Sequence, residues 1–132
     1  DTHNSYGPNR FMRQALEDKC IVLFGEGEET RSHIAVEDVV SLIVRGIQKQ
    51  QKGLTNAVTE PSYSFRAIAD LIVSLMPFPV SIQTQPRKTS ITHRHFDTSA
   101  LIQDFSDWEP VDIKVGLSKM LEQLTKEASY AT

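Results

Sequence analysis

The sequence predicts an α/β fold in which about four or five helices pack on a small mixed sheet. The apolar run at 20–24 is continuous, which is typical of a buried strand. Segments 65–76 and 113–128 instead carry apolar residues at helical spacing, which indicates two amphipathic helices. Because strand and helix patterns alternate over a length of 132 residues, we expect one layered domain, residues 1–132.

The other elements follow from shorter stretches of the same two patterns. In chain order we expect a helix over 9–18, the strand 20–24, a strand over 31–36, a helix from 39 that frays towards 52, a strand over 54–59, the helix 65–76, polar strands or loops over 80–83 and 89–96, a helix over 99–105 and the last helix. Gly25 and Gly27 form the turn after the first strand, and Pro77 ends the helix before it. Three helix N-termini find side-chain caps in Asp38, Asp112 and either Ser62 or Ser64.

The composition is that of a soluble globular domain with a formal net charge of −3. Proteins that bind nucleic acids or anionic membranes carry a cationic excess, so neither class of partner is expected. No apolar run reaches the length of a membrane span, and the single cysteine, Cys20, allows no internal disulfide. We therefore expect a cytoplasmic protein in which Cys20 is a small buried residue of the first strand.

The stretch 24–38 places an apolar strand, a glycine-bracketed acidic turn, an isolated arginine and a helix start in one compact order. This order resembles the substrate-binding element of the extended short-chain dehydrogenase/reductase family, the NAD(P)-dependent epimerases and dehydratases that act on nucleotide sugars. Further segments that resemble the family follow its order, so the resemblance covers nearly the whole chain: Tyr6 to Pro8, 96–101 and 107–110. It implies the C-terminal lobe of a Rossmann-type enzyme.

Two of the family's motifs do not occur in this sequence. The dinucleotide-binding half has a glycine-rich turn between a strand and a helix, whereas Gly25 and Gly27 lead into a strand. The catalytic tyrosine has a lysine four residues on, but Tyr6 is followed at that spacing by Arg10, and Tyr63 by an alanine. The resemblance thus implies a fragment of a larger enzyme whose N-terminal half holds most of the NAD or NADP, and no catalytic residue is assigned to this chain.

Arg31 is the first candidate for substrate binding. The resemblance places the family's phosphate-binding arginine here, and a guanidinium suits a diphosphate because it stays charged and can bond two oxygens at once. The alternative is a surface arginine that balances Glu26, Glu28 and Glu29. These three acids would oppose a phosphate ligand unless they point away from it.

A basic segment at 86–95 holds the second candidates. Arg87 matches the place of a further family arginine for the diphosphate or ribose, and Arg94 lies in the same cluster. The alternative is a solvated basic loop. His93 and His95 could share one face of a strand, but no third ligand of suitable type lies nearby in the sequence, so we expect no metal site.

The resemblance also assigns binding roles to apolar and turn residues. Val22 and Phe24 fall in the strand that packs against the nucleobase, for which core filling is an equal alternative. Tyr6 and Pro8 fall in the loop beside the nicotinamide ring of the cofactor, where a simple turn is the alternative.

The function that these observations favour is the substrate-binding portion of an NAD(P)-dependent nucleotide-sugar epimerase or dehydratase. Two alternatives stay open: a non-catalytic sensor or interaction relative of the same fold, and a reductase of a small carbonyl compound. We expect an exposed apolar face where an N-terminal dinucleotide-binding domain would dock. A homodimer also stays open.

Overall fold

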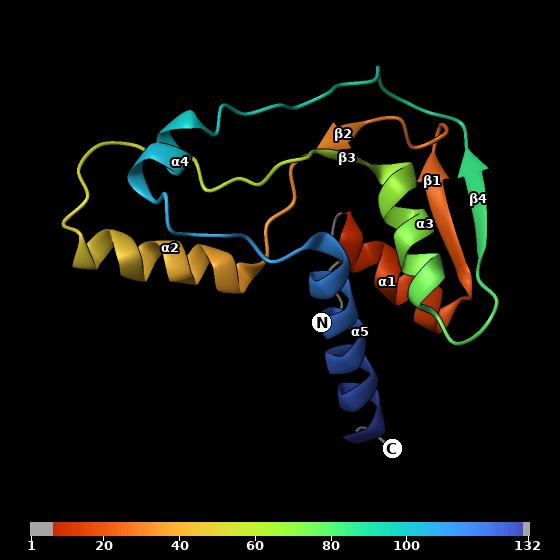
Figure 1. Cartoon of the computed structure of the whole chain (residues 1–132). Helices are drawn as coiled ribbons and strands as arrows, with labels where there is room; N and C mark the ends of the chain where they lie inside the picture. The colour runs from red at the N-terminus through yellow and green to blue at the C-terminus, as the bar shows by residue number, and fades with distance from the viewer. Residues whose placement is uncertain (1–6, 131–132) are drawn as a thin grey trace.

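The computed structural model describes residues 7–130, with side chains up to residue 127. Within that range five helices and four short strands follow one another along the chain (Figure 1). In order they are α1 (Pro8–Glu17), β1 (Cys20–Phe24), β2 (Thr30–Arg31), α2 (Val36–Gln48), β3 (Tyr63–Ser64), α3 (Phe65–Leu75), β4 (Ser81–Gln85), α4 (Ser99–Asp104) and α5 (Ile113–Tyr130). The predicted α/β fold class is confirmed.

The strands form two separate pairs. β1 and β4 are parallel, in a register that sets Cys20 opposite Ser81 and Phe24 opposite Gln85. β2 and β3 are antiparallel and only two residues long. The sheet structure is therefore mixed, as predicted, but the parallel and antiparallel pairings lie in two sheets.

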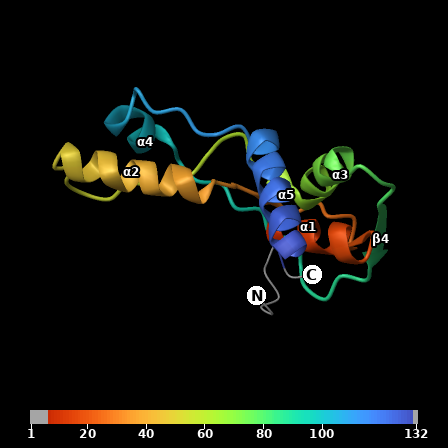
Figure 2. The same cartoon turned by 90° about the horizontal axis from the view of Figure 1, so that it is seen from below.

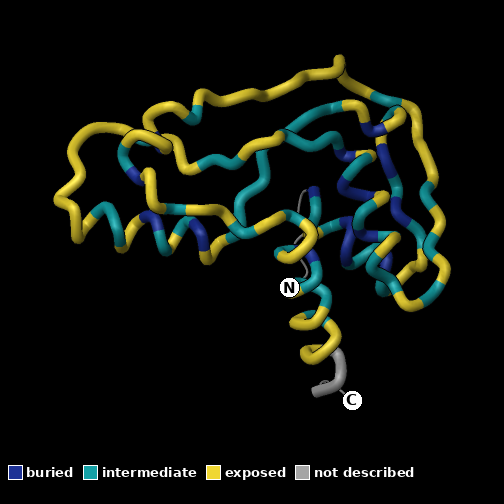
Figure 3. The backbone as a smooth tube through the Cα atoms, in the orientation of Figure 1, coloured by how far each residue is buried: buried dark blue, intermediate teal, exposed yellow. Residues whose placement is uncertain are grey.

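The main core lies between β1 and the helices α1, α3 and α5. Along β1, Ile21 and Leu23 are buried in it, whereas Val22 is half-buried and Phe24 is 42% exposed. Alternate side chains of a strand point to opposite faces, so β1 gives one face to the core and leaves the other outside it. Figure 3 shows the buried backbone concentrated around β1 and α3.

A second, smaller core joins α2 to α4. Its buried residues are Leu42, Leu101 and Phe105, and Trp108 packs against them. Figures 1 and 2 show α2 and α4 together, to one side of the main core.

Asp38 corrects one of the predicted caps. Helix α2 begins at Val36, and its N-cap is Ala35, which has no side-chain oxygen. Asp38 instead lies inside the first turn, is buried, and accepts the backbone N–H of Val111 on Oδ2 at 2.9 Å. The carboxylate thus fixes α2 to the segment before α5, and the bond gives the buried Asp38 side chain a partner.

Two predicted strands are wrong or much shorter than expected. The predicted strand at 31–36 is reduced to β2, and 54–59 forms no strand. Of the two segments predicted as strands or loops, 80–83 overlaps β4 and 89–96 forms no strand. Ser32 explains the outcome at 31–36 and 54–59, because its Oγ donates to the Thr59 carbonyl at 2.5 Å and accepts the Thr59 N–H at 3.2 Å. A side chain that bonds the backbone in this way replaces the rungs of a sheet ladder.

The remaining elements lie where the sequence places them, and their ends differ from the predicted ones by a few residues. Ser64 caps α3 by accepting the Ala67 N–H at 3.0 Å, and Asp112 caps α5 by accepting the Lys114 N–H at 2.9 Å. Cys20 is a free cysteine in β1, half-buried where full burial was expected. β3 was not predicted.

Helix α2 presents an apolar face to solvent. Its members, called here the α2 apolar face, recur at helical spacing and are 46–72% exposed: Val36, Val40, Ile43, Val44 and Ile47. The predicted exposed apolar face is therefore present on this chain. In the part of the chain that the structure describes, no helix is both long and apolar enough to cross a bilayer.

Candidate functional site

A pocket of about 410 Å³ opens at the carboxyl ends of β1 and β4. In a parallel pair these ends meet at the same edge, and the bond from the Gly25 N–H to the Gln85 carbonyl, 2.9 Å, closes the register there. The turn after β1 and the loop after β4 therefore lie side by side, and the N-terminal turns of α1 and α3 complete the wall. Ligands of α/β proteins characteristically bind at such strand ends.

Two glycines make the turn after β1 possible. Both have positive φ, 62° at Gly25 and 76° at Gly27. A Cβ at Gly27 would lie 2.8 Å from the backbone nitrogen of Arg66, and one at Gly25 would lie 2.6 Å from Nη2 of Arg87. The turn thus packs directly on the start of α3 and leaves space for a guanidinium.

Four predicted substrate-binding residues line this one pocket: Val22, Phe24, Arg31 and Arg87. They come from β1, from β2 and from the loop after β4, and chain topology alone brings them together. Arg94 is not among the lining residues. Its side chain is exposed, and its backbone N–H donates to the Thr30 carbonyl at 3.2 Å.

Arg31 lies at the edge of the pocket and holds the loop after β4. Its Cζ lies 5.7 Å from the ring centroid of Phe65. Nη1 donates to the carbonyls of Thr30, at 2.8 Å, and of Thr92, while Nη2 donates to Thr92 Oγ1 at 3.2 Å. Among the described residues the Nε–H and one Nη2–H of Arg31 have no hydrogen-bond acceptor.

Arg87 is held between two carboxylates. Its Nη2 lies 2.5 Å from Glu28 Oε2, and its Nη1 lies 3.2 Å from Glu29 Oε1. Glu28 and Glu29 therefore do not point away from Arg87. The sequence predicts that a bound phosphate requires the acids of this turn to point away from it, and these two do not meet that condition. Bonding to its own backbone N–H, together with the Arg87 guanidinium, holds the pKa of Glu28 below its ordinary value.

Three further pocket residues carry charge and were missed by the sequence reasoning: Arg10, Lys88 and Glu29. Arg10 comes from α1, and its Cζ lies 5.5 Å from the ring centroid of Phe24. Lys88 could have been found from its place beside Arg87. Arg10 belongs to no recognisable motif, because only the packing of α1 on β1 brings it here.

The residues predicted to bind a cofactor do not line this pocket. Tyr6 lies outside the described residues, and Pro8 is the first residue of α1 but does not line the pocket, although Gly7 does. The described residues hold no strand that passes through a glycine-rich turn into a helix, since the turn after β1 leads to β2. They therefore do not fit a primary dinucleotide site.

His93 and His95 lie beside Thr30, next to the site, and do not belong to a metal centre among the described residues. His93 Nδ1 lies 2.8 Å from Thr30 Oγ1, and the rings of His93 and His95 are stacked with centroids 6.3 Å apart. Among residues 7–127, no group of three metal-ligating side chains comes together. Burial, and then the charge of Arg31, lower the pKa of His33, whose Nε2 is buried with no partner among the described residues.

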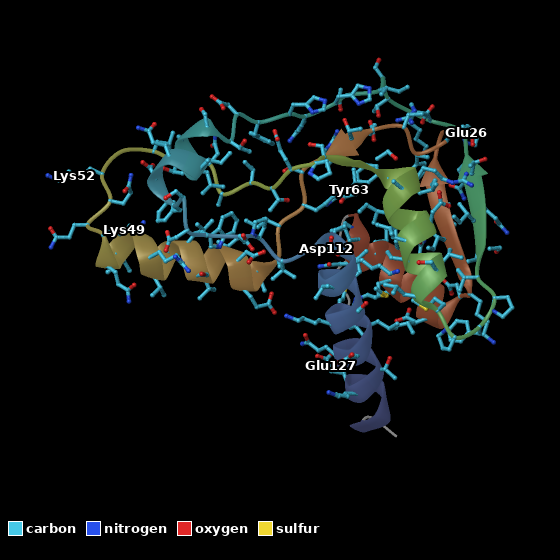
Figure 4. The ribbon with its side chains drawn as sticks, viewed as in Figure 1. Glu26, Lys49, Lys52, Tyr63, Asp112 and Glu127 are labelled. Carbon is cyan, nitrogen blue, oxygen red and sulfur yellow. The ribbon has the colours of Figure 1, made fainter. Side chains whose placement is uncertain are left out.

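A second hollow, of about 510 Å³, lies on α2 and contains none of the predicted site residues. Its two cations are already paired, because Asp107 lies 2.7 Å from Arg45 and 3.4 Å from Lys49, which Figure 4 labels. The Arg45 side chain holds the pKa of Asp107 below its ordinary value. These ion pairs join α2 to the segment that follows α4.

Known proteins that resemble this chain include nucleotide-sugar enzymes. Residues 2–59 match the model of the NAD-dependent epimerase/dehydratase family. The resemblance to that family is confirmed. The curated relatives of the chain include UDP-glucuronic acid decarboxylase 2 of Arabidopsis thaliana, 23% identical over 130 residues, and UDP-glucuronic acid decarboxylase 1 of Danio rerio, 24% identical over 123 residues.

Solved structures show the epimerase/dehydratase fold more fully. An NAD-dependent NDP-hexosamine 5,6-dehydratase of tunicamycin biosynthesis matches 93% of this chain and 40% of its own, with a TM-score of 0.80 and 20% identity. The UDP-glucose 4-epimerase of Thermotoga maritima, solved with UDP-glucose, matches 97% and 42%, with a TM-score of 0.73 and 23% identity. The alignments cover 90% and 92% of this chain but only 29% of each of the two curated relatives.

Proposed function

We propose that this chain forms the substrate-binding portion of an NAD(P)-dependent nucleotide-sugar epimerase or dehydratase. The observation that carries the proposal is the convergence of Arg31, Arg87 and Phe24 on one pocket at the carboxyl ends of β1 and β4. The proposal gives Arg31 and Arg87 the diphosphate of the substrate, and gives Phe24 and Val22 the nucleobase.

The chemistry of the pocket suits such a ligand. A diphosphate needs cationic donors in fixed positions, and guanidinium groups supply paired N–H bonds that an ammonium cannot reproduce. The exposed ring of Phe24 offers an apolar surface for a flat base. Arg10, Arg31, Arg87 and Lys88 give the lining a cationic excess over Glu29.

NAD or NADP would supply hydride transfer when bound, and the proposal assigns it to an N-terminal dinucleotide-binding half of the same protein. The described residues of this chain bind and orient the substrate. No catalytic residue is proposed among them.

The α2 apolar face is the proposed contact with that N-terminal half. A helix in a finished fold normally buries its apolar stripe, yet here five apolar residues of α2 face solvent while Leu42 is buried beneath them. The chain also covers only 40–42% of the two solved structures with the same fold, so in each of them most of the chain is available to cover such a face.

Calorimetric titration of the full protein with uridine diphosphate tests the proposed function. Arg31→Ala should weaken binding about ten- to a hundredfold, because a charge-assisted bidentate contact contributes about 1.5–3 kcal/mol. Arg31→Lys should recover part of the loss. Arg94→Ala is the matched control, since it removes an equal charge from an exposed arginine outside the pocket lining.

Two results would count against the proposal. Wild-type affinity in Arg31→Ala would return Arg31 to the role of a residue that holds the loop at Thr92. An equal loss in Arg94→Ala would mean that net charge, and not this pocket, sets the affinity.

A further inference from the structure

The two ion pairs of Arg87 differ in their distance and in how far each carboxylate is exposed to solvent. Arg87 is 16% exposed, and so is largely withdrawn from solvent. Glu29, its longer contact at 3.2 Å, is 15% exposed, whereas Glu28, its shorter contact at 2.5 Å, is 43% exposed. Glu29 is therefore the more enclosed carboxylate and lines the pocket with Arg87, whereas Glu28 is more exposed to water and lies beside the lining residues, not among them.

The oxygen of Glu28 also has a second donor. Oε2 accepts the backbone N–H of Glu26 at 3.0 Å in addition to Arg87 Nη2 at 2.5 Å. A guanidinium N–H and a backbone N–H that meet on one anionic oxygen make the kind of site that binds a phosphate oxygen. The carboxylate of Glu28 therefore stands where a phosphate oxygen of a ligand would be held.

The remaining charges of the pocket favour the exchange of one anion for another. Glu28 is not itself among the lining residues, so among the described residues Glu29 is the one acid on the lining, against Arg10, Arg31, Arg87 and Lys88. One carboxylate on Arg87 keeps its guanidinium oriented, and the other Nη group becomes available. A ligand that carries phosphate thus gains a donor pair that a neutral ligand cannot use.

We infer that Glu28 is an internal competitor for the phosphate-binding donors of Arg87 and the Glu26 N–H, and that a diphosphate ligand must displace it. This inference rests on the proposed function of the pocket and goes beyond it, because it makes Glu28 a residue that limits affinity and selects for phosphorylated ligands. Glu29 is a positioning residue that keeps Arg87 in place during the exchange.

Titration of the full protein with uridine diphosphate and, separately, with uridine tests the inference. Glu28→Gln removes the competing charge, so uridine diphosphate should bind about two- to fivefold more tightly, the range expected for a partly exposed ion pair. The gain should shrink at high salt, because screening already weakens the competing pair. Uridine, which has no phosphate, should bind equally to both proteins.

Glu26→Gln is the matched control. It removes the same charge from the same turn, but Glu26 contributes its backbone N–H to the contact, and that group is retained in the variant. Glu26 lies at the outer end of the turn above β1, as Figure 4 shows. Its substitution should change affinity much less than Glu28→Gln does, and thermal unfolding should show that both variants are folded.

The outcomes separate the inference from the proposed function. Equal gains in Glu28→Gln and Glu26→Gln would overturn the competition, because a general charge effect would then explain both. Weaker binding in Glu28→Gln would also overturn it and make Glu28 a support of Arg87. If Arg31→Ala loses affinity in either case, the proposed function stands; if the wild-type protein does not bind uridine diphosphate, both fail.

Discussion

The α2 apolar face allows a prediction in which the loss of stability on mutation differs in size between the full protein and the isolated chain. Ile43 is 58% exposed and Ile47 is 72% exposed on this chain. Burial of a whole isoleucine side chain contributes about 1.5–3 kcal/mol, so covering the exposed part of these two would contribute about 1–2 kcal/mol each. Replacing both by glutamine, which keeps the helix propensity, removes that contribution only where the face is covered.

Urea unfolding of two proteins measures this difference. In the full protein, Ile43→Gln with Ile47→Gln should lower the free energy of unfolding by about 2–4 kcal/mol. In the isolated chain the same pair should leave the stability nearly unchanged and should reduce self-association, because both side chains are exposed there.

Leu54→Gln is the control for this experiment. Leu54 is 91% exposed but lies outside α2, so its substitution should leave both proteins unaffected. Equal small effects of the α2 pair in both proteins would refute the docking of an N-terminal half on this face. A loss of stability in the isolated chain alone would assign the face to contacts between copies of the chain.

Two further predictions concern buried polar groups. The pKa of His33 is lowered by burial and by the charge of Arg31. As the pH falls below the ordinary histidine value of 6.5, the unfolded chain therefore takes up a proton before the folded chain does, and stability is lost. His33→Phe should reduce this loss in unfolding measured between pH 5 and pH 8, and an unchanged dependence of stability on pH would contradict the prediction. Asp38→Ala leaves the Val111 N–H without its acceptor, so the free energy of unfolding should drop by about 1–3 kcal/mol, whereas an equally stable variant would show that water replaces the carboxylate there.

The sequence predicts elements well where one pattern dominates. The continuous run of β1 and the helical spacing of α3 and α5 leave little choice, and all three lie where expected. Ser64 and Asp112 were found as caps because their side chains bond the backbone two or three residues away. Local rules suffice for such contacts.

Prediction fails where the partner lies far along the chain. Asp38 has the sequence context of a cap but bonds Val111, and Ser32 interrupts a strand by bonding Thr59. Neither choice is visible in a local pattern, since each depends on which distant N–H is left without an acceptor.

The same limit applies to the candidate site. The resemblance assigns binding roles to Arg31 and Arg87. The parallel register of β1 with β4 explains why Arg87 reaches the pocket, whereas Arg31 reaches it from β2, which pairs with β3. The pairing of Arg87 with Glu28 spans 59 positions and was not predicted. Arg10 was missed for the same reason, because a helix with no motif carries it to the ring of Phe24.

A crystal structure of the full protein with uridine diphosphate tests the central claim most directly. We expect the diphosphate within hydrogen-bond distance of Arg31 and Arg87, the base against Phe24, and the Glu28 carboxylate turned away from Arg87. A diphosphate bound elsewhere, with Arg87 still paired to Glu28 and Arg31 bonded only to Thr30 and Thr92, would contradict it.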